Sequence, residues 1–182
     1  MNYEIIQFRN HRIFKIKIEG LDKKTIIEDF GKEHVFLSKT HCADNIMRKS
    51  IRDLYSLCYE KIEYVYQSEL DRNIVSGYQS GWILNCKPSD YTGDYHIHTS
   101  FSPNYPNILS DFTWTYYLQV PDNLHDKEGH LLLKDEDEEF AILPEEGCLY
   151  TFESNLLHRG EIAPNSTKNR IVIVGNITFF YE

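Results

Sequence analysis

The chain is 182 residues long and carries a formal net charge of −9 at pH 7. A chain of this length is expected to form one domain, spanning residues 1–182, with a sizeable buried core. The negative charge argues against nucleic acid and anionic membranes as partners, because both present phosphate groups of the same sign.

The sequence shows no targeting or membrane segment. No apolar run approaches the length of a membrane span, and the N-terminal residues lack the basic and apolar regions of a signal peptide. Four cysteines are scattered without the Cys-x-x-Cys spacing of a zinc ribbon, and we interpret them as small buried side chains: Cys42, Cys58, Cys86 and Cys148. The expected location is the cytoplasm.

The N-terminal part predicts strands followed by helices. Residues 1–20 partly alternate apolar and polar side chains, which indicates one or two strands ending at Gly20. A short amphipathic helix is predicted over residues 21–30. A longer helix is predicted over residues 44–70, with Asp44 as its N-cap, from apolar side chains spaced three and four apart: Met47, Ile51, Leu54, Cys58, Ile62 and Val65. We expect this stripe to pack against the outside of a sheet.

The rest of the chain predicts short strands. The strongest is residues 113–120, with an apolar face of Trp114, Tyr116, Leu118 and Val120 and a polar face, suited to a hydrophilic cavity, of Thr113, Thr115, Tyr117 and Gln119. The other predicted strands are residues 81–86, 130–133, 140–142, 148–152 and 170–181, and the predicted loops are 87–93 and 100–111. Short strands after a helical region predict an α+β fold with a small β-barrel or sandwich core.

Much of the negative charge lies in residues 122–146, where ten acidic side chains stand against two lysines. A charge run of this kind is typical of a solvated loop and turn. We therefore do not expect this segment to form a binding surface.

Three histidines have the spacing of a metal site. His96 and His98 lie two apart in an extended run, residues 95–99, so both imidazoles leave the same face and can chelate one ion. Folding could bring His158 across a sheet to complete a facial triangle. Three protein ligands would leave coordination positions open, which suits a catalytic metal better than a structural one. The predicted loop 100–111 lies beside this site, where loops help to select substrates.

Arg170 begins the predicted final strand, twelve residues after His158. Its planar guanidinium would suit a carboxylate near the metal, because its donors match two oxygens. An ion pair with the acidic segment 122–146 is the alternative.

The C-terminal half contains five ordered motifs: His96-Ile-His98, Tyr116-Tyr-Leu-Gln-Val-Pro121, Glu146-Gly-Cys-Leu-Tyr-Thr-Phe152, His158 and Arg170-Ile-Val-Ile-Val-Gly-Asn176. Together they resemble the motifs of iron(II)- and 2-oxoglutarate-dependent dioxygenases. The motif sequences are most similar to those of small 2-oxoglutarate oxygenases of bacteria and phages. The resemblance implies a double-stranded β-helix (jelly-roll or cupin-like) core over residues 81–182, with residues 1–80 as supporting helices and strands.

The resemblance also implies cofactors and residue roles. Iron(II) would be held by His96, His98 and His158, with 2-oxoglutarate and dioxygen in the open positions. Arg170 would bind the distal carboxylate of 2-oxoglutarate, assisted by the hydroxyl of Tyr117, which shares its strand face with Thr115. The implied reaction releases succinate and CO2 and hydroxylates a substrate.

One position departs from the family pattern. The superfamily has a carboxylate two residues after the first histidine, whereas this chain has His98. Asp94 and Asp111 are nearby alternatives for the second metal ligand.

Two functions of other classes remain open. A zinc-dependent hydrolase or hydratase also uses three histidines, with a metal-bound hydroxide as nucleophile, but it leaves Arg170 and Tyr117 without a role. A non-catalytic jelly-roll binding module would need none of the histidines as ligands. The primary substrate, a small molecule or a protein, and the oligomeric state have no readable signature.

Overall fold

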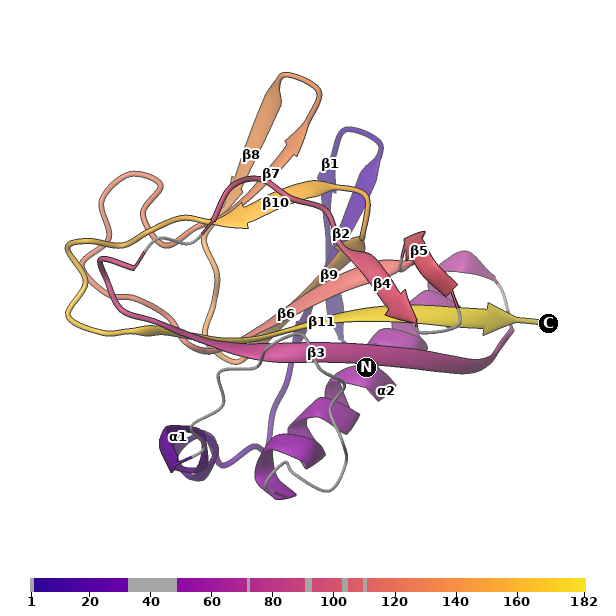
Figure 1. Cartoon of the computed structure of the whole chain (residues 1–182), viewed down its shortest axis with the longest axis horizontal. Helices are drawn as coiled ribbons and strands as arrows, with labels where there is room; N and C mark the ends of the chain where they lie inside the picture. The colour runs from indigo at the N-terminus through magenta and orange to yellow at the C-terminus, as the bar shows by residue number, and fades with distance from the viewer. Residues whose placement is uncertain (1, 33–48, 72, 91–92, 103–104, 110) are drawn as a thin grey trace.

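The computed structural model describes residues 2–32, 49–71, 73–90, 93–102, 105–109 and 111–182. The helices in these residues are α1 (Lys23–Lys32) and α2 (Lys49–Leu70) (Figure 1). The strands are β1 (Tyr3–Phe8), β2 (His11–Lys17), β3 (Ile74–Cys86), β4 (Thr99–Ser102), β5 (Tyr105–Leu109), β6 (Phe112–Gln119), β7 (Leu131–Asp135), β8 (Glu138–Ile142), β9 (Cys148–Glu153), β10 (Leu157–Gly160) and β11 (Arg170–Tyr181).

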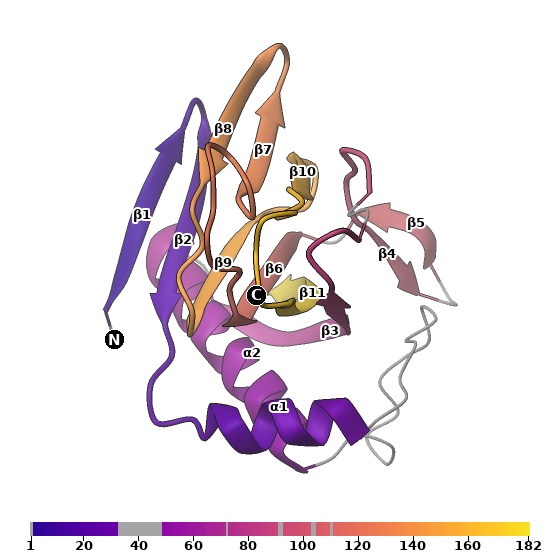
Figure 2. The ribbon, with the colours of Figure 1, turned by 90° about the vertical axis from the view of Figure 1, so that its left-hand side faces the viewer.

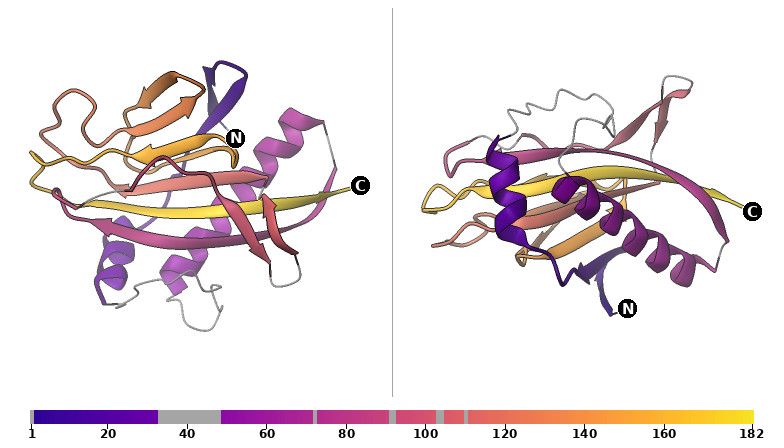
Figure 3. Two further views of the ribbon diagram at one scale, coloured as in Figure 1. Left: turned by 45° about the horizontal axis from the view of Figure 1, so that its top comes forward. Right: turned by 90° about the horizontal axis from the view of Figure 1, so that it is seen from below.

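Two antiparallel sheets enclose the interior. The major sheet has six strands in the order β1-β2-β9-β6-β11-β3, and the minor sheet has three in the order β10-β7-β8. A separate ladder joins β4 and β5. Figure 2 shows the minor sheet on one side of the major sheet, and Figure 3 shows both helices on the other side. The predicted α+β class with a sandwich core is confirmed.

Helix α2 packs its apolar stripe on the major sheet, as predicted. Its buried side chains are Ile51, Leu54, Tyr55, Cys58, Ile62, Val65 and Tyr66. They form one core with Trp114, Tyr116 and Leu118 of β6. Asp44 and Met47 of the predicted helix lie outside the described residues. No helix in the described part of the chain is long and apolar enough to cross a membrane.

Two glycines let the sheet and α2 approach closely. Gly81 of β3 pairs with Gly175 of β11, which pairs on its other side with Trp114 of β6. A Cβ atom at Gly175 would lie 2.4 Å from the Trp114 ring, and one at Gly81 would lie 2.5 Å from the Tyr55 hydroxyl. The rings of Tyr55 and Trp114 have centroids 5.2 Å apart. They therefore pack directly against the backbone of Gly81 and Gly175, which have no side chains.

Strand β6 separates the core from the interior between the sheets. Thr113, Thr115 and Tyr117 face that interior, so the predicted polar face is confirmed for these three. Gln119, predicted on the same face, departs from it. A register shift between Ile171 and Val172 of β11 breaks the alternation there, and Gln119 Nε2 donates instead to the carbonyl of Asn169 at 2.8 Å.

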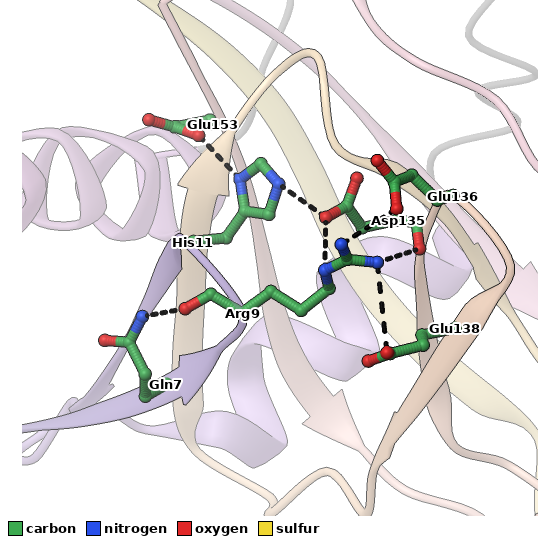
Figure 4. Close-up of polar contacts among 7 residues, drawn as sticks. All are labelled: Gln7, Arg9, His11, Asp135, Glu136, Glu138 and Glu153. Carbon is green, nitrogen blue, oxygen red and sulfur yellow. Dashed lines mark hydrogen bonds and ion pairs between the residues drawn. The ribbon is translucent and has the colours of Figure 1, made fainter.

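A polar cluster joins two hairpins at one end of the sandwich (Figure 4). We call it the hairpin clasp, and its members are Arg9, the imidazole of His11, Asp135, Glu136, Glu138 and Glu153. Arg9 in the β1–β2 turn lies 2.8 Å from Glu136 in the β7–β8 turn, measured from Nη2 to Oε2. Both residues have left-handed backbone, with φ of 51° and 52°. The clasp thus ties a major-sheet hairpin to a minor-sheet hairpin.

The structure corrects two predicted boundaries. The predicted loop 100–111 contains β4 and β5, which pair with each other from Thr99 and Leu109 onward. Strand β3 begins at Ile74 rather than at residue 81. Its first half lacks an alternating pattern but pairs with the end of β11, so long-range pairing decides its structure.

Candidate metal centre and cavity

Backbone pairing brings the three histidines together. His96 N donates to the carbonyl of His158 at 3.1 Å, and His158 N donates back at 3.0 Å. His98 N donates to the carbonyl of Ser154 at 3.1 Å. The segment with His96 and His98 therefore runs beside β10, and Ile97 between them points outward with 42% of its surface exposed. This is the same-face arrangement that the His-x-His spacing predicts.

Each imidazole is oriented by a hydrogen bond that its Nδ1 donates to a carbonyl oxygen. His96 donates to the backbone oxygen of Asp94 at 2.8 Å, and His158 donates to the backbone oxygen of Leu156 at 2.8 Å. His98 donates to the side-chain oxygen Oδ1 of Asn176 at 2.5 Å. With the proton on Nδ1, the lone pair that could bind a metal is on Nε2. The Nε2 atoms of His96 and His98 lie 3.1 Å apart, and one ring nitrogen from each histidine lies within 4.8 Å of the others.

The electrostatics of the group fit a divalent metal ion. His98 and His158 are buried, whereas His96 is exposed and leaves a way in from solvent. Burial, and after it the neighbouring His98, lowers the pKa of His158 to about 3. His158 is therefore a neutral imidazole at physiological pH, which is the form that binds metals.

The two alternative carboxylates lie outside this group. The carboxylate of Asp111 accepts a hydrogen bond from Phe179 N at 2.7 Å, and burial raises its pKa. Asp94 provides its backbone oxygen to His96. Among the described residues, the cluster with metal-binding geometry contains His98 and neither aspartate.

The histidines open onto a cavity of about 260 Å³ between the sheets. The major sheet lines it with Trp82, Leu84, Thr113, Thr115, Tyr117, Phe152, Arg170, Val172 and Val174, and the other side with His96, His98, Leu131, His158, Arg159 and Gly160. Within this described lining there are two arginines and no carboxylate. The cavity therefore favours an anionic ligand.

Arg170 is held in this wall as a buried cation, with 7% of its surface exposed. Its Nη1 donates to the carbonyl of Glu161 at 3.1 Å, and its Nε has no hydrogen-bond partner among the residues described. The predicted alternative, an ion pair with the acidic segment, is not found for Arg170 in the described chain. Gly160 makes room for the guanidinium, because a Cβ there would lie 2.3 Å from Nη1.

Tyr117 and Thr115 lie on the same wall, as predicted. Burial raises the pKa of the Tyr117 hydroxyl to about 12, against the opposing effects of Arg170 and of a hydrogen bond with Thr115. Tyr117 is therefore protonated at neutral pH, and its hydroxyl can donate to an anion beside Arg170.

Two residues of the site were not identified from the sequence. In the sequence, Asn176 is only the last residue of the motif that begins at Arg170, and Gly160 belongs to no pattern. Only the strand pairing shows that Asn176 reaches His98 and that Gly160 lies under Arg170. The signal in the sequence was the even spacing of Arg170, Val172, Val174 and Asn176, which places them on one strand face.

Solved structures with a similar fold include prolyl hydroxylases and a protein of the 2OG-Fe(II) oxygenase family. A prolyl-4-hydroxylase from Pseudomonas putida superposes with a TM-score of 0.62 at 13% identity, over 95% of this chain and 88% of that one. The viral collagen prolyl hydroxylase of Paramecium Bursaria Chlorella virus-1, solved as a 2OG complex, gives 0.57 at 16% identity over 90% and 94%. The chain has the fold of the 2OG-Fe(II) oxygenases.

A Burkholderia pseudomallei protein of the 2OG-Fe(II) oxygenase family is also similar, with a TM-score of 0.51 at 10% identity over 98% of this chain and 73% of that one. No family model matches the sequence, and no curated protein matches it either. The oxygenase fold, a jelly-roll double-stranded β-helix, confirms the fold that the five motifs implied.

Proposed function

We propose that this protein is an iron(II)- and 2-oxoglutarate-dependent oxygenase that hydroxylates an organic substrate and releases succinate and CO2. The observation that carries the proposal is that three convergent histidines and a buried arginine open onto one cavity in an oxygenase fold. The fold alone does not specify the reaction, and these residues supply the chemistry.

His96, His98 and His158 would hold the iron ion through Nε2. Three protein ligands leave three positions of an octahedral ion for the 2-oxo acid and dioxygen. Iron with these two cosubstrates supplies the oxidising chemistry when bound. The protein holds the three imidazoles as neutral ligands and keeps their Nδ1 protons on fixed acceptors.

Arg170 would bind the distal carboxylate of 2-oxoglutarate, with the Tyr117 hydroxyl as a second donor and Thr115 beside it. A buried guanidinium with an unpartnered Nε–H favours a ligand with oxygen acceptors, because an unsatisfied buried donor is costly. The second arginine in the lining, Arg159, is already paired with Glu161, at 2.7 Å from Nη2 to Oε2, so Arg170 is the residue assigned to the carboxylate.

Apolar side chains would keep water from the reacting centre. Phe152 contacts the His158 ring edge to face, with centroids 4.9 Å apart, and the Trp82 ring lies 5.1 Å from that of His98. Leu131, Val172 and Val174 complete the apolar lining. A dry cavity strengthens the electrostatic contacts of the bound anion.

The test is metal-dependent turnover of 2-oxoglutarate. Protein purified without oxygen is loaded with iron(II), and succinate is measured after oxygen is added, with and without 2-oxoglutarate. Succinate above the level of a metal-free control supports the proposal. His96→Ala and His158→Ala are expected to lose iron and succinate formation together, because two remaining ligands bind a divalent ion weakly.

The same experiment separates the other functions. Tight zinc binding with no iron-dependent succinate would favour the hydrolase or hydratase, and absence of any divalent metal binding would favour the binding module. Either result would reject the oxygenase. The cytoplasm, which keeps iron and thiols reduced, is the compartment proposed for this activity.

A further inference from the structure

His98 differs from the other two histidines in what orients it. His96 and His158 each donate their Nδ1 proton to the backbone carbonyl two residues earlier, an acceptor that mutation of a side chain does not remove. His98 instead donates to the side chain of Asn176, at 2.5 Å and 78 residues away in sequence. The Nδ1 hydrogen bond of His98 can therefore be removed by a single side-chain substitution.

The amide of Asn176 is itself held in a buried network. Thr113 pairs with Asn176 across the β6–β11 ladder, and its Oγ1 lies 3.3 Å from Asn176 Oδ1 and 3.2 Å from Ser154 Oγ. Asn176 is 7% exposed, and Thr113 and Ser154 are each 1% exposed. The Thr113 hydroxyl is the donor in both contacts, and because it carries one proton it shares that proton between Ser154 Oγ and Asn176 Oδ1.

Donation from Thr113 to Asn176 favours the orientation in which the amide oxygen faces the histidine. With Thr113 donating to it, the group beside His98 is the oxygen, and it accepts the Nδ1 proton. A reversed amide would present its NH2 group, which would place the His98 proton on Nε2. A protonated Nε2 has no lone pair for a metal ion.

We propose that Asn176 is a positioning residue that selects the metal-binding tautomer of His98, with Thr113 fixing the direction of its amide. The inference rests on the metal site of the proposed function. It explains how a histidine can replace the carboxylate of the family pattern as the second ligand. An imidazole that binds a metal through Nε2 needs a hydrogen-bond acceptor for its Nδ1 proton, whereas a carboxylate has no such proton.

Metal affinity is the first measurement. Cobalt(II) or zinc(II) affinity is determined by competition with a chromophoric chelator for wild type, Asn176→Leu, Asn176→Asp and Thr113→Val. Removing an outer hydrogen-bond partner of a metal-binding histidine weakens affinity about 10- to 100-fold, and Asn176→Leu is expected to do so. Asn176→Asp retains an acceptor and is expected to recover most of the affinity.

The matched control is Thr178→Val, an isosteric change on the same strand, two residues along. The Thr178 hydroxyl is buried without a hydrogen-bond partner in the described structure, so its loss removes no contact of the histidines. Its metal affinity is expected to equal that of wild type.

The tautomer of His98 is the second measurement and needs neither metal nor activity. Two-bond ¹H–¹⁵N NMR of the metal-free protein distinguishes an imidazole protonated at Nδ1 from one protonated at Nε2. We expect Nδ1–H in wild type and Asn176→Asp, and a shift towards Nε2–H in Asn176→Leu. If Asn176→Leu does not fold, the His98 tautomer of Thr113→Val is compared with that of wild type instead. This variant keeps the Asn176 amide but removes the Thr113 donor, so the same shift towards Nε2–H is expected.

Two results would overturn the inference. One is a wild-type affinity and tautomer in both Asn176→Leu and Thr113→Val. The other is a loss of affinity with no change of tautomer, which would mean that Asn176 only supports packing. In either case iron-dependent succinate formation by the wild type would leave the proposed function intact. Absence of metal binding by the wild type would reject both.

Discussion

At the scale of single residues, Arg170 offers the most direct test of the cosubstrate site. Arg170→Lys keeps the positive charge but loses the planar fork of donors, so 2-oxoglutarate is expected to bind roughly ten- to a hundredfold more weakly. Titration of the iron-loaded protein, followed by the absorption band that appears when a 2-oxo acid chelates iron(II), measures this affinity. Tyr117→Phe is expected to cause a smaller loss. Equal affinities in wild type and Arg170→Ala would contradict the assignment.

Gly160 is expected to control the position of the same guanidinium. The methyl group of Gly160→Ala would overlap Nη1, and the mobile end of a long side chain can shift where backbone cannot. The variant should therefore fold normally but bind 2-oxoglutarate more weakly, by at least about tenfold, which corresponds to one charge-assisted hydrogen bond. Circular dichroism and the same titration test this, with metal affinity as the internal control. A variant with unchanged cosubstrate affinity would show that Arg170 binds in another position.

Sequence patterns are enough to predict site residues whose side-chain type already suggests a function, such as histidine for a metal and arginine for a carboxylate. The three histidines, Arg170, Tyr117 and Thr115 all reach one cavity, although their roles as ligands remain predictions. Asn176 and Gly160 could not be found in this way. An asparagine and a glycine acquire their roles only from the side chain that the sheet places against them.

At the scale of elements, Arg9 of the hairpin clasp combines ion pairs with a strained backbone conformation, and substitutions at this residue separate their effects on stability. Left-handed backbone costs a residue other than glycine roughly 1–2 kcal/mol, and Arg9 has this conformation. Arg9→Ala loses the ion pairs and keeps the strained backbone, whereas Arg9→Gly loses the pairs and relieves it. Arg9→Gly is therefore expected to be the more stable variant in urea unfolding. Equal stability of the two variants would show that the turn relaxes.

Hydrogen bonds between Asp122 and the loop before β11 are predicted to make part of the stability of the fold sensitive to acid. We call this contact the acid-sensitive link. Asp122 accepts hydrogen bonds from Thr167 N at 2.7 Å and from the hydroxyls of Thr167 and Ser166. These contacts, first of all the backbone one, lower the pKa of Asp122 to about 2. Its contribution to stability is therefore present above the unfolded pKa, about 3.9, and is lost as pH falls through 2.

The control for this link is Asp122→Asn, which lacks the titrating group. Wild type is expected to melt at a higher temperature than Asp122→Asn at pH 6, and the difference should shrink as the pH falls from about 5 to 2. Other titrating groups are common to both proteins and cancel in the difference. A difference that stays constant over this range would refute the link.

Elements with a strong local pattern were predictable. Residues 170–181 coincide with β11, and the stripe of α2 lies on the sheet as expected. The first half of β3 and the β4–β5 ladder were missed because their sequences carry serine, glycine and proline rather than alternation. Their structure comes from partners that are distant or not recognisable in sequence, such as the end of β11 for β3.

At the scale of the whole molecule, the contact between α2 and the sheet depends on Gly175. Gly175→Ala would force a methyl group into the Trp114 ring, and overpacking of this kind costs about 1–3 kcal/mol in the free energy of unfolding. Trp114→Phe removes the indole atoms that the methyl would meet. Gly175→Ala is therefore expected to cost less in a Trp114→Phe background, as measured by urea denaturation. An equal cost in both backgrounds would rule out this contact as the cause.

Strand β11 serves the core and the cavity at once. Ile171, Ile173 and Ile177 face α2, while Arg170, Val172 and Val174 face the cavity. Because side chains alternate with a period of two, the loss or gain of one codon within β11 would turn every later residue to the opposite face. Point mutations in this strand can therefore alter the cavity and the core separately, whereas a single-codon deletion disrupts both. A change of length is accordingly expected to be tolerated only in the connections on either side of β11.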